Sequence, residues 1–424
     1  MNITESKVTK YIGLLIILMM LIISLSCSVL AKEEDIFNIG VVTSLTGEFA
    51  KGGEITVRGY NFWADAVNEQ GGILIGDKRY KVKLIYLDDR SDNATAAKAT
   101  ERLALIEKVD LILGPFGDTT IACVPICEKY SIPMIDGSCE APQLWEMQPE
   151  WVFGTCPAGP MNIKGPLDML NEKLVSKIKT FAVVGINRPY DSKTAEKARE
   201  IGEGFGWKLV DYEILPSGLA DFSSIVTKIK KADPDLFVVS ALLEDHFKII
   251  PAMKDYNYFP KALVMHYGPT APEFIDNLGE DAEYIIGASP WTPEMKLKGE
   301  FFGTAQEFAK NFKAAYGHFP DYTEAACGAA GIVAAEALKE IGATPPLSIE
   351  KRKELKDAIA NVDIDTFYGR VKFMTEKGDK FYHCIELFPS AAQFQGGKLW
   401  VVGSEKEENI EKQLIYPAPS WEER

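Results

Sequence analysis

The chain has 424 residues, of which 46% are hydrophobic and 25% are charged, and this length is too great for one ordinary core, so we expect two domains. Its formal net charge is −15, and no dense cluster of Lys and Arg interrupts the acidic balance. An acidic surface repels phosphate backbones and anionic lipid, so the charge excludes a typical nucleic-acid-binding protein.

The N-terminal segment predicts export. Lys7 and Lys10 precede an uncharged apolar run at residues 11–26, which is the order of regions in a secretory signal peptide. We favour a signal peptide at residues 1–31 with a lipoprotein-like box in which Cys27 is lipidated. Cleavage after Ala31 is the first alternative, and a retained anchor is disfavoured because the run is shorter than the ~20 residues of a spanning helix. Each outcome places the body of the chain outside the cytoplasm, and loss of this segment changes the net charge to −16 because two lysines and one glutamate leave.

From residue 36 onward, apolar runs alternate with amphipathic segments, which is typical of a parallel sheet with crossover helices. The first series predicts strands at 36–45, 80–88, 111–114 and 132–135, and helices at 54–69, from about 91, and at 118–130. The short strand at 111–114 is wholly apolar, so both of its faces should be covered. In the helix that begins near Asp92, the residues spaced for one buried face are Ala96, Ala99, Leu103 and Ile106.

A second series begins near residue 159. It predicts strands at 180–185, 207–215, 236–240, 262–265 and 284–289, with helices between them that include 191–205 and one opened by Asp221. Helices near 299–315, 322–341 and 348–360, a strand at 367–373 and a β-rich tail follow. The late helices have no sheet of their own, so we expect them to return to the first domain. Several chain crossings between the domains would result, and these would act as a hinge.

Loops at one kind of strand end predict a ligand site. Parallel sheets bind ligands beyond the carboxyl ends of their strands, where helix N-termini present free N–H groups. The loops at these ends are 44–53, 114–120 and 136–140 in the first series, and 187–191, 243–245 and 266–268 in the second. Gly, Pro, Ser and Asp also form ordinary loops, and for any single loop that explanation is preferred. All six loops share one kind of strand end, which favours a common cleft.

Five stretches carry a family resemblance: VVTSLTGEFAKGGEITVRGYNFWADAVNEQGGI, LILGPFGDTT, EKYSIPMIDGS, DFSSIVTKIKKADPD and YPAPSWEER. Together they resemble the Leu/Ile/Val-binding, or branched-chain amino acid, family of type I periplasmic binding proteins, from about Asn38 to the end. The resemblance implies an α/β fold of two Rossmann-like, three-layer lobes joined by a multi-strand hinge. The N-terminal lobe would comprise 36–158 and 291–372, the C-terminal lobe 159–290 and 373–416, and residues 417–424 would form a tail.

The resemblance also implies a function. Such a chain would be an extracytoplasmic substrate-binding protein of an ABC importer, which captures a small polar molecule such as an amino acid or amide between its lobes. The expected partners are this ligand and permease subunits in the membrane. We expect a monomer with no cofactor, no metal and no nucleic-acid partner.

In this family, loops of the first lobe hold the carboxylate of an amino acid with hydroxyl and backbone N–H groups. The matching positions here are Gly117, Asp118, Thr119, Ser138, Cys139 and Glu140. Asp118 and Glu140 depart from the pattern, because hydroxyl residues are usual there. A ligand carboxylate about 4 Å from either would be destabilised by on the order of 4 kcal/mol at an effective dielectric of ~20. We therefore expect either that these side chains face away or that the ligand offers a cationic or hydrogen-bond-donating group.

The second lobe departs from the family as well. An acidic residue that holds the ligand ammonium is usual after its fourth strand, but His266, Tyr267 and Gly268 follow here, and Glu244 or Asp245 could substitute. Tyr190 resembles a family tyrosine that closes on the ligand, although packing at the hinge would also explain it. The aromatic residues expected near the cleft are Phe49, Phe116, Tyr190 and Tyr267, whereas ordinary core packing is favoured for Trp145 and Trp291.

Six cysteines follow Cys27, and the chain has four histidines. Cys123 and Cys127 lie one helical turn apart, but the histidines show no zinc spacing with them, so buried thiols or one or two disulfides are expected. Two other functions stay open. One is a sensory module that acts through a partner chain. The other is a hydrolase that uses Asp118 and Glu140 as a carboxylate pair, which is disfavoured because G-x-S-x-G is missing. A nicotinamide dehydrogenase is disfavoured because G-x-G-x-x-G is missing in register.

Overall fold

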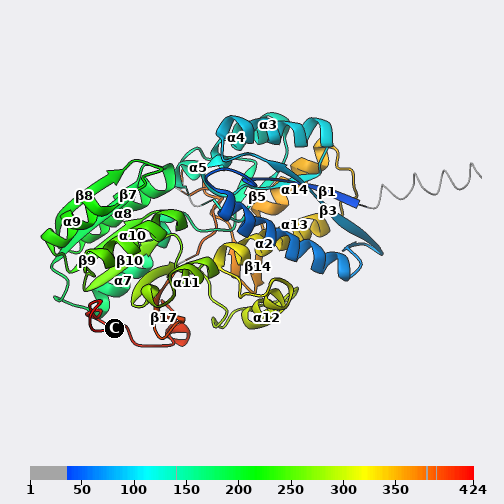
Figure 1. Cartoon of the computed structure of the whole chain (residues 1–424). Helices are drawn as coiled ribbons and strands as arrows, with labels where there is room; N and C mark the ends of the chain where they lie inside the picture. The colour runs from blue at the N-terminus through cyan, green and yellow to red at the C-terminus, as the bar shows by residue number, and fades with distance from the viewer. Residues whose placement is uncertain (1–35, 140, 379–380, 388) are drawn as a thin grey trace, which may run out of the picture.

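The protein consists of two α/β lobes that lie side by side in a computed structural model, which describes residues 36–139, 141–378, 381–387 and 389–424 (Figure 1). The predicted signal peptide at 1–31 and its Cys27 lie outside the described residues. None of the helices in the described ranges combines the length and the apolar composition needed to cross a membrane.

The first lobe is built on a sheet with the strand order β2-β3-β1-β4-β5-β6. Its strands are β1 (Ile36–Thr43), β2 (Ile73–Ile75), β3 (Lys78–Asp88), β4 (Leu111–Leu113), β5 (Met134–Asp136) and β6 (Val152–Gly154). Four strand pairs of this sheet are parallel: β1/β3, β1/β4, β4/β5 and β5/β6. The hairpin of β2 and β3 is antiparallel. All three residues of β4 are buried, as predicted for a strand covered on both faces.

Helices cover both faces of this sheet and make the three layers (Figure 1). They are α2 (Ala50–Glu69), α3 (Asn93–Arg102), the π-helix η1 (Leu103–Glu107), the short 3-10 helix η2 (Gly117–Thr119), α4 (Thr120–Tyr130), α5 (Pro142–Glu146), α12 (Ala305–Tyr316), α13 (Tyr322–Glu340) and α14 (Ile349–Ala360). The late helix α13 packs along α2, and α3 packs along α4. Small side chains make the α13 packing close: a Cβ at Gly331 would lie 2.1 Å from the ring of Trp63 on α2. The return of the late helices to the first lobe is thus confirmed.

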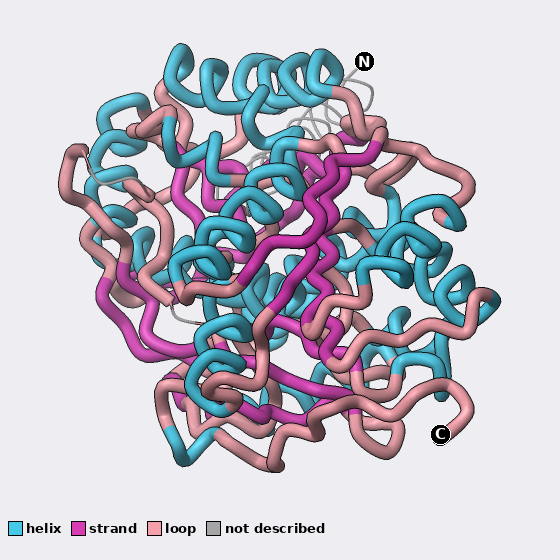
Figure 2. Tube along the Cα trace, turned by 90° about the vertical axis from the view of Figure 1, so that its left-hand side faces the viewer, coloured by secondary structure: helices cyan, strands magenta, loops and turns pink. Residues whose placement is uncertain are grey.

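The second lobe has the strand order β17-β16-β11-β10-β9-β7-β8. Its strands are β7 (Thr180–Ile186), β8 (Lys208–Leu215), β9 (Leu236–Ser240), β10 (Ala262–His266), β11 (Ile285–Ser289), β16 (Ser390–Phe394) and β17 (Leu399–Gly403). Its helices are α6 (Gly159–Asn162), α7 (Lys164–Lys173), α8 (Pro189–Gly204), α9 (Ser223–Ala232), α10 (Leu243–Asp255), α11 (Pro272–Leu278), η3 (Gly279–Ala282) and η4 (Glu407–Asn409). Strands β7 to β11 pair in parallel, whereas β16 joins β11 antiparallel. Figure 2 shows the strands running inside a shell of helices.

Three chain crossings join the lobes, after β6, after β11 and before β16, as the strand order of the two sheets requires. Between the second and third crossings lie two hairpins, β12 (Lys298–Gly299) with β13 (Gly303–Thr304) and β14 (Asp363–Thr366) with β15 (Gly369–Lys372). The third crossing comes later than the predicted boundary at 372. The backbone N–H of Gly154 in β6 donates to the carbonyl of His383 at 3.0 Å, so residues as far as 385 still pair with the first lobe.

The strands and helices predicted for both series are found, with three corrections. The predicted helix at 299–315 begins at Ala305, because Thr304 forms a capping box with Glu307 after the β12/β13 hairpin. The predicted strand at 367–373 is the second half of a hairpin. Ile106 is 69% exposed although Ala96, Ala99 and Leu103 are buried, because the π turn η1 inserts a residue and rotates the last turn away from the core.

The six described cysteines are buried, and none of them is joined in a disulfide, so of the two predicted alternatives the structure has buried thiols: Cys123, Cys127, Cys139, Cys156, Cys327 and Cys384. The tail at 417–424 packs on the second lobe. There the Trp421 indole N–H donates to the carbonyl of Tyr258 at 2.9 Å, and the Ala418 N–H donates to that of Lys261 at 2.8 Å.

Candidate functional site

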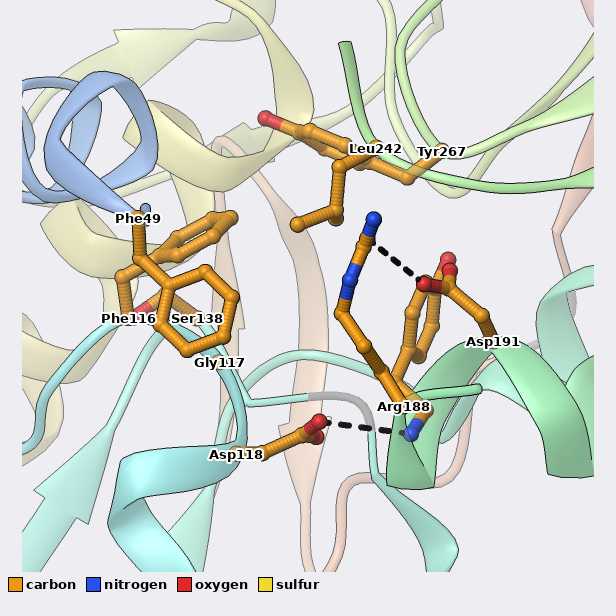
Figure 3. A pocket seen from close by; sticks show the side chains of 10 residues that line it. Phe49, Phe116, Gly117, Asp118, Ser138, Arg188, Asp191, Leu242 and Tyr267 are labelled. Atoms are coloured by element: carbon orange, nitrogen blue, oxygen red, sulfur yellow. Dashed lines mark hydrogen bonds and ion pairs between the residues drawn. The ribbon is translucent and has the colours of Figure 1, made fainter. Parts of the chain in front are cut away.

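A cavity lies between the lobes at the carboxyl ends of both sheets and contains about 400 Å³ of space free of atoms. The first lobe lines it with Phe49, Phe116, Gly117, Asp118 and Ser138, and the second with Arg188, Tyr190, Asp191, Leu242 and Tyr267 (Figure 3). The strand-end loops named from the sequence therefore do meet at one hollow. Of the predicted ligand-binding residues, the lining includes Phe49, Phe116, Gly117, Asp118, Ser138, Tyr190 and Tyr267.

Aromatic rings form one wall of the cavity. Phe49 at the start of α2 and Phe116 before η2 lie 6.4 Å apart by ring centroids, and Phe116 lies 6.1 Å from Tyr267 of the other lobe. Gly52 makes room for this arrangement, because a Cβ there would come within 2.2 Å of the Phe116 ring. The rings offer an apolar surface whose faces also attract cations.

Asp118 is the charged residue of the first lobe that lines the cavity, and its side chain points toward the space between the phenyl rings and Arg188 (Figure 3). Asp118 is 8% exposed. This burial raises the pKa of its carboxyl to about 6, although the Tyr190 N–H and the charge of Arg188 both lower the pKa. Carboxyl Oδ2 accepts the backbone N–H of Tyr190, at the start of α8, at 3.5 Å. Within the described residues, Oδ1 has no hydrogen-bond partner.

Arg188, which sequence reasoning missed, is surrounded by carboxylates. Its Nη1 donates to Asp191 Oδ2 at 2.9 Å, its Nη2 pairs with Asp245, and its Nε lies 3.2 Å from Glu48 Oε1 of the first lobe. Asp191 is fully buried, and burial raises the pKa of its carboxyl well above the ordinary value despite Arg188. The sequence predicts a ligand site at the loop 187–191, which contains Arg188. A charged residue so close to the end of an apolar strand could have identified this arginine.

Two described residues of the first lobe that were predicted to bind the ligand, Thr119 and Cys139, do not line the cavity. The Thr119 hydroxyl donates to Asp89 Oδ2 at 2.9 Å, which holds it against β3. The backbone N–H of Cys139 donates to Asp136 Oδ1 at 3.0 Å, and its thiol is buried. Glu140 lies outside the described residues.

Ser138 lines the cavity, but its polar groups are used inside its own lobe. Its hydroxyl donates to the Pro115 carbonyl at 3.1 Å, and its backbone N–H donates to Asp136 Oδ1 at 2.7 Å. The Gly117 N–H in turn donates to the Ser138 carbonyl at 3.4 Å. Burial raises the pKa of Asp136 to about 6, against the lowering effect of these donors. The loop is thereby organised around a buried aspartate.

Glu244 lies beside a smaller adjoining hollow of about 210 Å³ of free space, which it lines with Glu48, Phe49 and Tyr267 among others. Burial raises the pKa of its carboxyl. Its neighbour Asp245 instead pairs with Arg188. Glu244 and Asp245, which were predicted as possible partners of a ligand ammonium, therefore lie near the cavity but do not line it.

The lobes touch along the cleft, so this is a closed arrangement. Arg58 of α2 pairs with Glu273 of α11 at 3.1 Å, and the Tyr267 hydroxyl donates to Asp321 at the start of α13 at 3.3 Å. Trp145 and Trp291 are buried in the core, as favoured from the sequence. Among the described residues there is no group of three His, Cys, Asp or Glu side chains placed to hold a metal ion.

Comparisons with known proteins agree with this geometry. Residues 37–395 match the family described as periplasmic binding protein. The Leu/Ile/Val-binding protein homolog 7 of Brucella suis biovar 1 (strain 1330) is 23% identical over 340 residues, which cover 77% of this chain and 81% of that protein.

Solved structures share the fold. The branched-chain amino acid transporter substrate-binding protein LivJ from Streptococcus pneumoniae, in complex with isoleucine, has a TM-score of 0.73 and 23% identity, with 86% of this chain and 97% of that chain covered. A solute-binding protein of an ABC transporter from R. palustris, in complex with benzoate, has a TM-score of 0.73 and 21% identity, covering 91% and 97%.

Two α/β lobes that share three connections and meet at one small cavity define a two-lobed binding protein. The chain belongs to the periplasmic binding protein family, and its fold is that of the solved structures named above.

Proposed function

We propose that the protein is the extracytoplasmic substrate-binding protein of an ABC importer, which captures a small molecule such as an amino acid, an amide or a related compound between its lobes. The observation that carries this proposal is the cavity lined by strand-end loops of both lobes. A guest held from both sides stabilises the closed arrangement, because it contacts both lobes only when they meet.

The permease would bind the closed form of the protein. Closure brings Glu48 of the first lobe to Arg188 of the second and Arg58 to Glu273, so it changes the surface on both rims of the cleft. Permease subunits that bind this surface distinguish loaded from empty protein. In this proposal the chain acts as a monomer. Its two lobes move as rigid bodies about the three chain crossings that join them.

Export and anchoring are part of the proposal. The predicted signal peptide would deliver the protein across the membrane, and lipidation of Cys27 would hold it at the outer face. Intact mass spectrometry of protein purified from membranes tests this. A mature chain that begins at Cys27 with an added lipid mass supports anchoring, and one that begins at Lys32 shows cleavage without an anchor.

A thermal-shift screen of amino acids, amides, urea, polyamines and aromatic acids identifies ligands for the functional test. Small-angle scattering with and without a stabilising compound then measures closure. We expect the radius of gyration to fall when the compound is saturating. An unchanged radius with a tightly bound compound would contradict capture by hinge closure.

A further inference from the structure

Carboxylates outnumber cations around the cavity. In the part of the chain that the structure describes, the cation that lines the cavity is Arg188. It lies among three carboxyl groups, those of Glu48, Asp191 and Asp245, and Asp118 adds a fourth across the cleft. Burial raises the pKa of Asp191 well above its ordinary value, and the other three carboxylates still outnumber Arg188. A guest that carries a positive charge is therefore favoured, and an anionic guest is opposed.

Arg188 is not placed to hold a ligand carboxylate. A guanidinium recognises a carboxylate through its N–H groups in a planar fork. Here Nη1 donates to Asp191 and Nη2 pairs with Asp245, while Nε lies 3.2 Å from Glu48 but makes no hydrogen bond within the described residues. A ligand carboxylate at Arg188 would lie beside three carboxylates that already surround this cation, and their charge would oppose it.

Four first-lobe donors near the cavity are also occupied. The Ser138 hydroxyl donates to the Pro115 carbonyl, and the Ser138 and Cys139 N–H groups donate to Asp136. The Gly117 N–H donates to the Ser138 carbonyl at 3.4 Å. These four donors are directed into the loop, while a side chain of the same lobe presents an acceptor to the cavity.

That acceptor is Oδ1 of Asp118. The side chain is more than nine-tenths buried and lines the cavity, and within the described residues this oxygen has no hydrogen-bond partner. The other oxygen receives the Tyr190 N–H at 3.5 Å, a long contact that accounts for one oxygen only. A buried carboxylate oxygen requires a donor, and a ligand ammonium would supply one.

On these observations we infer that the ligand is a primary amine with an apolar body and no carboxylate, bound with its ammonium group at Asp118 and its body against Phe49, Phe116 and Tyr267. The inference rests on the proposed function and narrows its ligand class. The ring faces of the aromatic wall favour the same charge, because a cation within about 6 Å of a ring centroid is attracted to its face.

The test uses two matched series in isothermal titration calorimetry at pH 7.5. One series is phenethylamine, phenylalanine and 3-phenylpropanoate, and the other is 3-methylbutylamine, leucine and 4-methylpentanoate. Within each series the apolar body is conserved and the charged groups change. We expect the amine to bind at least tenfold more tightly than the amino acid and the acid. Equal or tighter binding of the acid or the amino acid would overturn the inference.

Two variants assign the preference to Asp118. Asp118→Asn should reduce the amine preference at least tenfold, while Asp77→Asn should leave it unchanged, because Asp77 is exposed at the β2/β3 turn and carries the same charge. A preference that survives in Asp118→Asn overturns the inference. If acids bind tightly and compact the protein in scattering, the binding-protein proposal stands and only the amine inference fails. If no compound of either series binds, the amine inference fails, and the wider thermal-shift screen then decides the binding-protein proposal.

Discussion

Replacing Asp118 with asparagine should shift the ligand-free protein toward the closed arrangement. Burial in the closed cavity raises the pKa of this carboxyl from 3.8 to about 6, so the ionised form is disfavoured there. One pKa unit corresponds to about 1.36 kcal/mol, so the shift corresponds to about 3 kcal/mol at neutral pH, or roughly a hundredfold in a conformational equilibrium. Asparagine has no charge to bury and retains an oxygen that accepts the Tyr190 N–H. The variant should therefore close more readily wherever opening returns water to residue 118.

The pH dependence has a definite sign. A carboxyl whose pKa is raised by closure binds a proton more tightly in the closed state, so wild-type protein should close as the pH falls through about 6. The other groups that face Asp118 are Glu48, which raises its pKa, Arg188, which lowers it, Asp191 and the Cys139 thiol. They contribute to the response of both proteins. The difference between wild type and Asp118→Asn isolates residue 118.

Small-angle scattering of ligand-free protein at pH 7.5 and pH 5 measures this equilibrium. We expect the radius of gyration of Asp118→Asn to be smaller than that of wild type at pH 7.5, and the difference to narrow at pH 5, where protonation removes about half of the penalty in wild type. Asp77→Asn serves as the control for removal of one negative charge and should follow wild type. Superimposable profiles of wild type and Asp118→Asn at both pH values would refute the conclusion that closure desolvates this carboxyl.

Three further predictions concern other parts of the molecule. Gly52→Ala should weaken ligand binding at least tenfold in calorimetry and destabilise the protein by about 1–3 kcal/mol, because its Cβ would lie 2.2 Å from the Phe116 ring; Gly204→Ala, with open space around it, should do neither. Glu273→Gln removes the negative charge from the 3.1 Å contact with Arg58 between the lobes, so affinity should fall about twofold to fivefold at low salt and less at high salt. No change at low salt would show that the ion pair does not support closure. A thiol reagent should label none of the six described cysteines in native protein and all of them after unfolding, without prior reduction; fewer thiols would reveal a disulfide.

The sequence was sufficient for most elements of both sheets because their strands are apolar runs with clear boundaries. The strand predicted at 236–240 is β9, and all five of its residues are buried. Asp92 was predicted as an N-cap and accepts the Thr95 N–H at 2.8 Å. The prediction that Ile106 is buried was wrong, because helical periodicity assumes 3.6 residues per turn and the π turn at Leu103–Glu107 has more.

The site was predictable in position but not in chemistry. Strand-end loops identify where residues gather, which is why Phe116 and Tyr190 were named and do line the cavity. Which donor groups remain available there depends on contacts between loops. The buried Asp136, whose sequence neighbours gave no sign of its role, accepts the N–H groups of Ser138 and Cys139. Asp191 lies three residues from Arg188 in the sequence, whereas Glu48 and Asp245 are distant in the sequence and only the tertiary structure brings them to Arg188.

The cost of burying Asp118 and its selectivity for a guest have one origin. Closing the empty cleft removes water from the Asp118 carboxylate and supplies only the long Tyr190 N–H contact to one of its oxygens, so the charge opposes closure. An amine supplies both a donor and the opposite charge, and so removes the penalty at the moment it binds. A ligand of the same size without an ammonium group could pack against the aromatic wall, but the cost of burying the Asp118 carboxylate would remain. On this reasoning the residue that selects the ligand also prevents the empty protein from presenting the closed surface to a permease, and Asp118→Asn should lose both properties together.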